Sequence, residues 1–191
     1  MKSKTGKIIV ICAPSGCGKS TILNTLLDSG ICNLKFSVSA TNRKPRPDEE
    51  DGVHYHFMST DQFRDAVAEG KFVEWEQVYP GRYYGTLKSE LQGAIDSGEN
   101  VVLDIDVKGA MHVKELFGDK VLTIFILPPD IETLRKRLIG RGTDAMDEIE
   151  RRVNRARYEI SFADKCDGRV INDDLETAIS DTRRLIRDFI G

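Results

Sequence analysis

The residues most able to do chemistry form a short glycine-rich stretch near the N-terminus, within KIIVICAPSGCGKSTILNTLL at residues 7–27. Its end, Gly18-Lys19-Ser20, fits the phosphate-binding loop G-x-x-x-x-G-K-S/T, although Ala13 stands where the first glycine belongs. In such a loop, backbone N–H groups point into one concavity at a helix N-terminus, where the helix dipole adds positive potential. We therefore expect Lys19 to reach the β- and γ-phosphates of ATP and Ser20 to bind Mg²⁺. The candidate ATP-binding residues of this loop are Ala13, Pro14, Ser15, Gly16, Cys17, Gly18, Lys19, Ser20 and Thr21.

Two residues of the loop need separate interpretation. Ala13 lies where the predicted strand ends and the turn begins, and one methyl group fits there if φ is negative. The part that cradles phosphate, Gly16–Ser20, keeps its glycines, so we expect the loop to bind nucleotide. Cys17 is either a small residue that fits the loop or a reactive thiol.

A strand and a helix must hold this loop in place, and the sequence predicts both. Residues 7–12 are typical of a buried strand, and the apolar spacing after Lys19 predicts a helix over 19–29. A second buried strand, NVVLDID at 100–106, ends in two carboxylates. With a spacing of two, Asp104 and Asp106 are expected on one strand face, where at least one would hold the water shell of Mg²⁺. The alternative is an ordinary helix cap at the strand end.

The rest of the chain alternates between strand and helix patterns. Further strands are expected at 120–129 and in GRVIND, and helices after the candidate N-cap Asp130 and in the last 17 residues before Gly191. This alternation predicts a parallel sheet covered by helices on both faces, the α/β core of a P-loop NTPase. Two segments interrupt it, a mixed insertion with strands at 53–59 and 71–79, and an arginine-rich segment with the composition of a mobile lid. The expected units are core 1–36, insertion 37–90, core 91–138, lid 139–157 and core 158–191.

Bulk composition limits the class of protein. The chain has 191 residues, 31% of them charged, and a formal net charge of −3, which argues against a general binder of nucleic acid or membrane surfaces. We find no apolar run of transmembrane length and no signal peptide. The four cysteines show no metal-binding spacing, which favours thiols in a reducing cytoplasm. Oligomeric state, monomer or homodimer, is left open.

The insertion carries a candidate site for a second phosphate. Arg43 and Arg46 are three residues apart and separated by Pro45, which stiffens the segment. Two guanidinium groups held close suit bidentate recognition of a phosphate, and Tyr55 and Tyr84 could add hydroxyl donors. A solvated basic loop is the alternative.

The chain resembles the guanylate kinases. The resemblance rests on APSGCGKST, SVSATNRKPRPDEEDGVHYHF, FVEW, YYGT, LDIDVKGA and GRGTD…IERRV, which follow one another through nearly the whole sequence. It implies an enzyme that phosphorylates GMP with MgATP, on a P-loop core with a mixed α/β GMP-binding insertion and a helical lid. The departures are Ala13 in the loop, Asn42 where the family usually has Thr, and Asp48 where it usually has Gly.

The resemblance also implies roles for individual residues. Arg43, Arg46, Tyr55 and Tyr84 would hold the GMP phosphate, and the lid would bring further arginines to the phosphates. The residues implied at guanine are Ser39, Glu74, Gly85, Thr86 and one of Asp104 or Asp106. Ser20 and Asp106 are the residues expected on the side of the metal ion. The residues implied in catalysis are Lys19, Arg43, Arg46, Arg137, Arg141 and Arg152, and Asn172 is implied near the adenine of ATP.

Elementary chemistry agrees with this assignment. Guanine presents its N1–H and N2–H donors side by side, so Glu74 could accept from both, whereas adenine has an acceptor at N1. Without the resemblance, Glu74 is simply a polar residue that alternates with apolar ones on a strand. The GMP phosphate is already anionic, so no general base is needed, and the three histidines are interpreted as structural. Rival interpretations are a guanylate-kinase-like module that binds proteins and a kinase for another small phosphate acceptor; dGMP is an expected second substrate.

Overall fold

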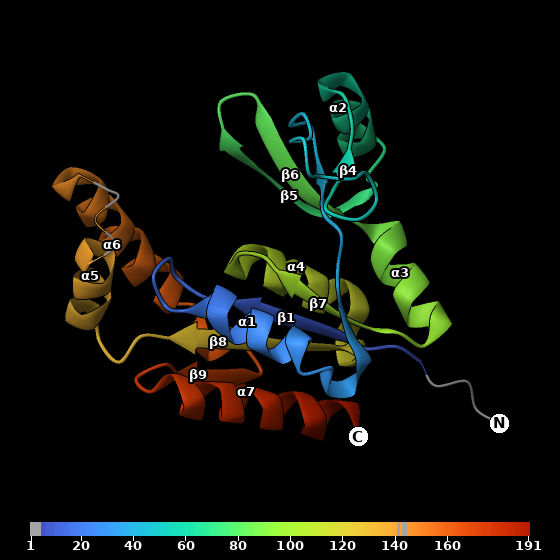
Figure 1. Ribbon diagram of the computed structural model, residues 1–191. Helices are drawn as coiled ribbons and strands as arrows, with labels where there is room; N and C mark the ends of the chain where they lie inside the picture. The colour runs from blue at the N-terminus through green and yellow to red at the C-terminus, as the bar shows by residue number, and fades with distance from the viewer. Residues whose placement is uncertain (1–4, 141, 143–144) are drawn as a thin grey trace.

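The computed structural model describes residues 5–140, 142 and 145–191, and within this part the side chains of Val78 and Tyr79 are excluded. A five-stranded parallel sheet forms the core (Figure 1). In spatial order its strands are β2 (Leu34–Phe36), β7 (Asn100–Asp104), β1 (Ile8–Cys12), β8 (Val121–Leu127) and β9 (Gly168–Ile171). The loop with the phosphate-binding pattern therefore leaves the central strand, and the carboxyl end of β7 lies directly beside it.

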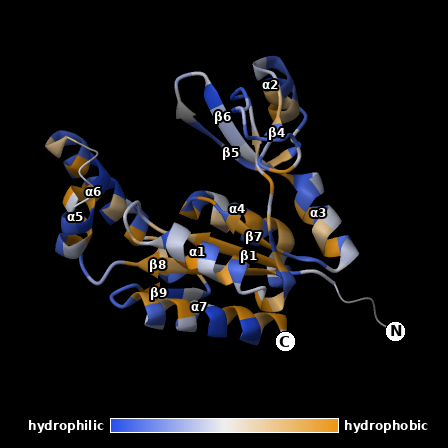
Figure 2. Cartoon of the chain, in the orientation of Figure 1, coloured by the Kyte–Doolittle hydropathy of each residue, from blue (hydrophilic) through white to orange (hydrophobic). Residues whose placement is uncertain are grey.

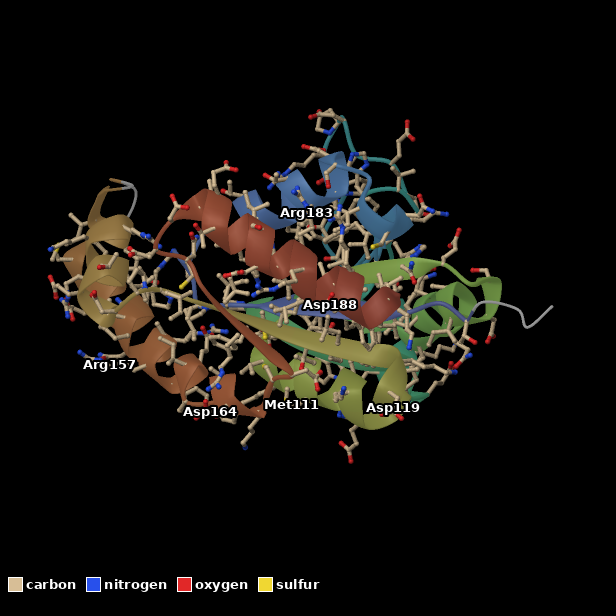
Figure 3. The ribbon with its side chains drawn as sticks, turned by 90° about the horizontal axis from the view of Figure 1, so that it is seen from below. Met111, Asp119, Arg157, Asp164, Arg183 and Asp188 are labelled. Atoms are coloured by element: carbon tan, nitrogen blue, oxygen red, sulfur yellow. The ribbon has the colours of Figure 1, made fainter. Side chains whose placement is uncertain are left out.

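Helices cover both faces of this sheet because the side chains of β1 alternate between two hydrophobic clusters. Ile9 and Ile11 pack with α1 (Lys19–Asp28) and α7 (Leu175–Ile190) on one face. Ile8 and Val10 pack with α3 (Lys88–Ser97) and α4 (Val107–Phe117) on the other. Figure 2 shows the central strands as the most hydrophobic part of the chain, and Figure 3 shows α7 beside α1 across the lower face. This arrangement confirms the predicted α/β core.

The insertion forms a second, smaller sheet, which lies above the core in Figure 1. Its strand order is β4 (His56–Phe57), β3 (Ala40–Thr41), β6 (Arg82–Leu87) and β5 (Phe72–Tyr79), of which only β3 and β4 are parallel. The helix α2 (Thr60–Ala68) begins with a capping box between Ser59 and Gln62. Phe63 of this helix stacks on Phe72 of β5 with ring centroids 4.5 Å apart, which gives the insertion its own core.

The segment expected as a lid lies at the other side of the core, on two packed helices (Figure 1). These helices are α5 (Ile131–Gly140) and α6 (Met146–Ile160). Asp130 caps the first of them, as predicted, because its carboxylate accepts the backbone N–H of Thr133 at 2.7 Å. Mobility of this pair stays a prediction. Three short 3-10 turns complete the described elements, at Ile31–Asn33, Gly118–Lys120 and Ala163–Lys165.

Two local predictions were wrong. The strand expected over 53–59 is only β4, because a turn closed by a hydrogen bond from Gly52 N–H to the Tyr55 carbonyl (2.8 Å) occupies the preceding residues. The strand expected over 100–106 ends at Asp104, since Asp106 caps the next helix. None of the helices in the described part of the chain is long and apolar enough to cross a bilayer.

Candidate functional site

The glycine-rich loop joins β1 to α1 as the sequence predicts. Gly16 and Gly18 take left-handed backbone conformations, with φ of 94° and 80°, which side chains rarely adopt. Ala13 does not adopt a positive φ, so its methyl group is tolerated where the family pattern has glycine. Gly18 is the N-cap of α1 and the first turn of this helix contains no acidic residue, so nothing in that turn neutralises the positive end of the helix dipole.

The loop lysine faces a carboxylate on the neighbouring strand. Lys19 forms an ion pair with Asp104, the last residue of β7. Asp104 reaches it because β7 and β1 are parallel neighbours, with Asp104 paired in register with Ile11 near the start of the loop. The two side chains are 20% and 28% exposed, so both are open to a ligand that enters from the cleft.

Asp106 occupies a different environment from Asp104. Its carboxylate accepts the backbone N–H of Gly109 at 2.8 Å and thereby caps α4. It also lies near Glu74, because its negative charge contributes to raising the pKa of that residue. The structure therefore separates the two carboxylates that the sequence placed on one strand face: Asp104 lies at the loop and Asp106 lies towards the insertion.

Glu74 of β5 is a partly buried carboxylate at the inner face of the insertion. Thr86 of β6 is fully buried, and its hydroxyl donates to the Glu74 carboxylate at 2.6 Å. Burial raises the pKa of Glu74 above its usual value, while the Thr86 hydrogen bond opposes the shift. A carboxylate held in this way offers a fixed acceptor to a ligand with adjacent N–H donors.

These groups line one cleft of about 950 Å³ between the core, the insertion and the lid helices. The predicted site residues that line it are Ala13, Pro14, Ser15, Gly16, Cys17, Gly18, Lys19, Ser20, Thr21, Ser39, Tyr55, Glu74, Tyr84, Gly85, Asp104, Asp106 and Arg152. The tertiary structure thus brings the phosphate loop and the Glu74 carboxylate to the same space.

Two arginines predicted to hold phosphate, Arg43 and Arg46, are not among the described residues that line this cleft. Arg43 and Arg46 line a second pocket of about 570 Å³. Glu49 organises their loop, since it accepts from Arg43 Nη2 and from the backbone N–H of Arg46, each at 2.8 Å. Glu49 raises the pKa of Arg43, and Arg43 in turn lowers the pKa of Glu49 to about 2. Arg43 also lies over the ring of Tyr55, 5.4 Å from its centroid, and Tyr55 lines the main cleft.

Asn42, which departs from the family pattern, precedes Arg43 and connects this segment by hydrogen bonds to three other parts of the insertion. Its amide nitrogen donates to the Thr60 hydroxyl at 2.9 Å and to the Gly81 carbonyl at 2.8 Å. Its amide oxygen accepts the backbone N–H of Tyr83 at 2.8 Å. The side chain therefore extends the pairing between β3 and β6 by one position and connects it to the start of α2.

Helix α6 contributes arginines to the cleft. Arg152 of α6 donates to the Ser15 hydroxyl of the loop at 3.3 Å. Arg155, one turn later, lies 3.6 Å from the Glu76 carboxylate of β5, so α6 contacts the insertion as well as the core. Arg137 of α5 is half-buried and is not among the described residues that line the cleft. Arg141, predicted here too, lies outside the described residues.

Comparison with known proteins decides the family. A sequence model of guanylate kinase matches residues 5–189. The chain belongs to the guanylate kinase family. It is 50% identical to a guanylate kinase of Bacteroides fragilis over 98% of this chain and 93% of that protein. A guanylate kinase of Porphyromonas gingivalis is 49% identical, over 97% and 98% of the two chains. The crystal structure of guanylate kinase from Anaplasma phagocytophilum matches with a TM-score of 0.72 and 30% identity, over 97% of this chain and 86% of that one.

Membership of the guanylate kinase family makes this chain an ATP-dependent nucleoside monophosphate kinase, as the sequence predicted. The residues present fit a magnesium ion brought by a nucleotide. Ser20 is exposed at the loop, and Asp104 forms an ion pair with the adjacent Lys19. Ser20 and Asp104 both line the cleft, and their oxygen donors suit Mg²⁺, which keeps several waters and uses substrate phosphates. In the described part of the chain no cluster of His, Cys, Asp or Glu forms a closed metal cage.

Sequence reasoning overlooked five charged residues that line the cleft, namely Glu76, Glu148, Arg151, Arg155 and Glu159. Arg155 and Glu76 both line it, opposite each other. Periodicity could have found them, because Arg155 follows Arg152 by one helical turn and Glu76 follows Glu74 by two strand positions. Asn172 lies against the loop, where its amide donates to the Cys17 carbonyl at 2.8 Å, and its predicted place near adenine stays a prediction.

Proposed function

We propose that the protein transfers the γ-phosphoryl group of ATP to GMP, producing ADP and GDP, within the cleft described above. One observation supports this assignment most strongly. The partly buried Glu74 carboxylate, oriented by Thr86, lines the same cleft as the phosphate loop. A fixed acceptor facing that loop suits a purine with two adjacent N–H donors, which guanine has and adenine lacks.

The donor side uses the loop and its surroundings. The amides of Gly16–Ser20 cradle the phosphates of ATP at the N-terminus of α1, and Lys19 neutralises the β- and γ-phosphates. Ser20 and Asp104 would hold Mg²⁺ through its water shell, and the ion would supply positive charge to the donor phosphates. This choice of Asp104 replaces Asp106, because Asp104 contacts the loop lysine while Asp106 caps α4.

The acceptor side uses the insertion. Glu74, Ser39, Gly85, Thr86 and Asp106 surround guanine, and Arg43, Arg46, Tyr55 and Tyr84 hold the GMP phosphate. Arg43 and Arg46 line the neighbouring pocket, so this role requires their guanidinium groups to turn towards the cleft when GMP binds. We also propose dGMP as a second substrate, because it presents the same guanine and the same phosphate as GMP.

Catalysis then depends on alignment and charge. The attacking atom is an oxygen of the GMP phosphate, which is already anionic and needs no general base. Lys19, Arg43 and the lid arginine Arg152 reduce the repulsion between the two phosphates as they approach. Arg137 and Arg141 are assigned to the same role in the closed lid. Closure excludes water and so prevents transfer of the phosphoryl group to water.

The same proposal places the enzyme in the cytoplasm, where both nucleotides occur. Four cysteines without metal-binding spacing suit a reducing compartment, in which Cys12 and Cys166, with Sγ atoms 4.0 Å apart, would remain thiols.

A coupled assay of ATP consumption tests the acceptor, with Mg²⁺ and GMP, dGMP, AMP, UMP or CMP offered separately. We expect turnover with GMP, weaker turnover with dGMP, and none with the other three. A Glu74→Gln variant should lose activity with GMP while its affinity for ATP stays unchanged. Equal turnover of AMP and GMP by the native protein would contradict the role given to Glu74. No turnover with any nucleotide, in a protein that still binds ATP, would contradict the proposed reaction.

A further inference from the structure

Asn172 connects the end of the core sheet to the phosphate loop. It follows β9 directly, and its side chain is almost fully buried, with the residue 5% exposed. Its backbone N–H donates to the Leu127 carbonyl of β8 at 2.8 Å, and its side-chain amide donates to the Cys17 carbonyl at 2.8 Å. One buried residue therefore fixes a carbonyl of the loop relative to the rigid sheet.

The orientation of that carbonyl also determines where the next amide points. In a trans peptide the C=O and the N–H point in opposite directions. The described residues contain no cis peptide bond, so with the Cys17 carbonyl directed at Asn172, the N–H of Gly18 is directed away from β9. Gly18 lines the cleft and Asn172 is not among the described residues that do, so the amide is turned to the side where the phosphates bind.

The close approach of Asn172 also accounts for the glycine at position 18. A Cβ atom on Gly18 would lie 2.4 Å from the side-chain nitrogen of Asn172, a distance that real atoms do not adopt. Gly18 also has a φ of 80°, which disfavours any side chain. The position of Asn172 therefore requires glycine at residue 18, and both residues adjoin the same peptide unit of the loop.

We propose that Asn172 is a positioning residue for phosphate binding: it holds the Cys17–Gly18 peptide so that the Gly18 N–H faces the phosphates of the donor nucleotide. This inference deepens the proposed function, since it rests on ATP binding at the loop, and it differs from a contact with adenine. A contact with adenine would affect binding of the base, whereas the hydrogen bond from Asn172 to the Cys17 carbonyl would affect binding of the phosphates alone.

The variant Asn172→Ala tests the proposal, with binding of ATP and of inorganic tripolyphosphate measured separately by calorimetry. The variant removes the hydrogen bond from Asn172 to the Cys17 carbonyl, so both ligands should bind about tenfold more weakly, by a similar factor. The variant Asn172→Asp should weaken both further, because a carboxylate would face the carbonyl oxygen. Asn33→Asp, which makes the same change of charge at an exposed residue outside the cleft, is the matched control and should leave both affinities unchanged.

Other outcomes overturn the proposal. Weaker binding of ATP with unchanged binding of tripolyphosphate would assign Asn172 to the base. Unchanged binding of both, with a lower melting temperature, would make the residue purely structural. Asn172→Ser provides the same comparison if the alanine variant does not fold. Because binding is measured without an acceptor, these results do not depend on whether GMP is the substrate.

Discussion

Lys19 of the phosphate loop and Asp104 at the carboxyl end of β7 form an ion pair across the floor of the cleft. The pair directs the lysine towards the edge of the sheet where the carboxyl ends of the parallel strands meet. A phosphate that enters the loop would offer Lys19 a second anionic partner, and Asp104 would then be the carboxylate next to the loop that could hold the water shell of Mg²⁺. The position of this carboxylate distinguishes it from Asp106, two residues later.

The two carboxylates should respond differently to the same substitution. Asp104→Asn should raise the Mg²⁺ concentration for half-maximal activity by about tenfold, as expected when a group that orients metal-bound water is lost. Asp106→Asn should leave the Mg²⁺ titration and the melting temperature unchanged, because asparagine caps a helix as well as aspartate does. Titration of kcat against Mg²⁺ with both variants checks this. The reverse pattern would restore Asp106 as the metal-side residue.

Glu74 should make GMP binding sensitive to acid. Burial raises the pKa of this carboxyl above its ordinary value of 4.5, and guanine requires the ionised form. KM for GMP should therefore rise as the pH falls, with a midpoint above 4.5, while KM for ATP does not follow it. Thr86→Val removes the hydrogen bond that lowers this pKa and should move the midpoint to higher pH. A midpoint that does not move would exclude Glu74 as the titrating group.

The same shift has a consequence for stability, and its sign is opposite to that of a salt-bridged carboxylate. Because the pKa of Glu74 is higher in the folded state, the folded protein holds this proton more tightly than the unfolded chain. The contribution of Glu74 to the free energy of unfolding is fully present below the pKa that this group has in the unfolded chain. It is lost as the pH rises through the pKa that the group has in the folded protein. In the Glu74→Gln variant, the free energy of unfolding measured with denaturant should not show this fall as the pH rises between the two pKa values of Glu74.

Arg152 should contribute to catalysis rather than to folding. It comes from the lid helix α6 and already contacts Ser15 of the loop. Arg152→Ala should lower kcat by about 10² or more, in the range of arginines that stabilise a transferring phosphoryl group. Arg157→Ala is a matched control on the same helix, because Arg157 is exposed on the outer side of the molecule (Figure 3). Steady-state kinetics of both variants check this, and an unchanged kcat for Arg152→Ala would remove it from the catalytic residues.

Ala13 should prove neutral for nucleotide binding. Its φ is not positive, so the loop does not require glycine there. Ala13→Gly should change KM for ATP little and lower the free energy of unfolding by about 0.4–1 kcal/mol, since glycine gives the unfolded chain more conformational freedom. Kinetics and urea denaturation measure the two effects. A large fall in KM would instead show that the alanine impairs the loop.

The sequence by itself determined those features that depend on neighbours along the chain. The loop between β1 and α1, the cap at Asp130 and the parallel α/β core follow from local spacing and apolar periodicity. The residues that form the site could likewise be named, because their motifs follow one another in the order found in the family. Short-range backbone geometry and hydrogen bonding are encoded in a few adjacent residues, so a pattern suffices to predict them.

Only the tertiary structure decided which of these groups meet. Asp104 and Asp106 differ by two positions, yet the end of β7 sends one to Lys19 and the start of α4 takes the other as a cap. Asn172 reaches Cys17 across 155 positions, because β9 joins the sheet next to β8. Such contacts depend on strand order and on where each strand stops. Strand order arises from packing of the whole core, which no local pattern contains.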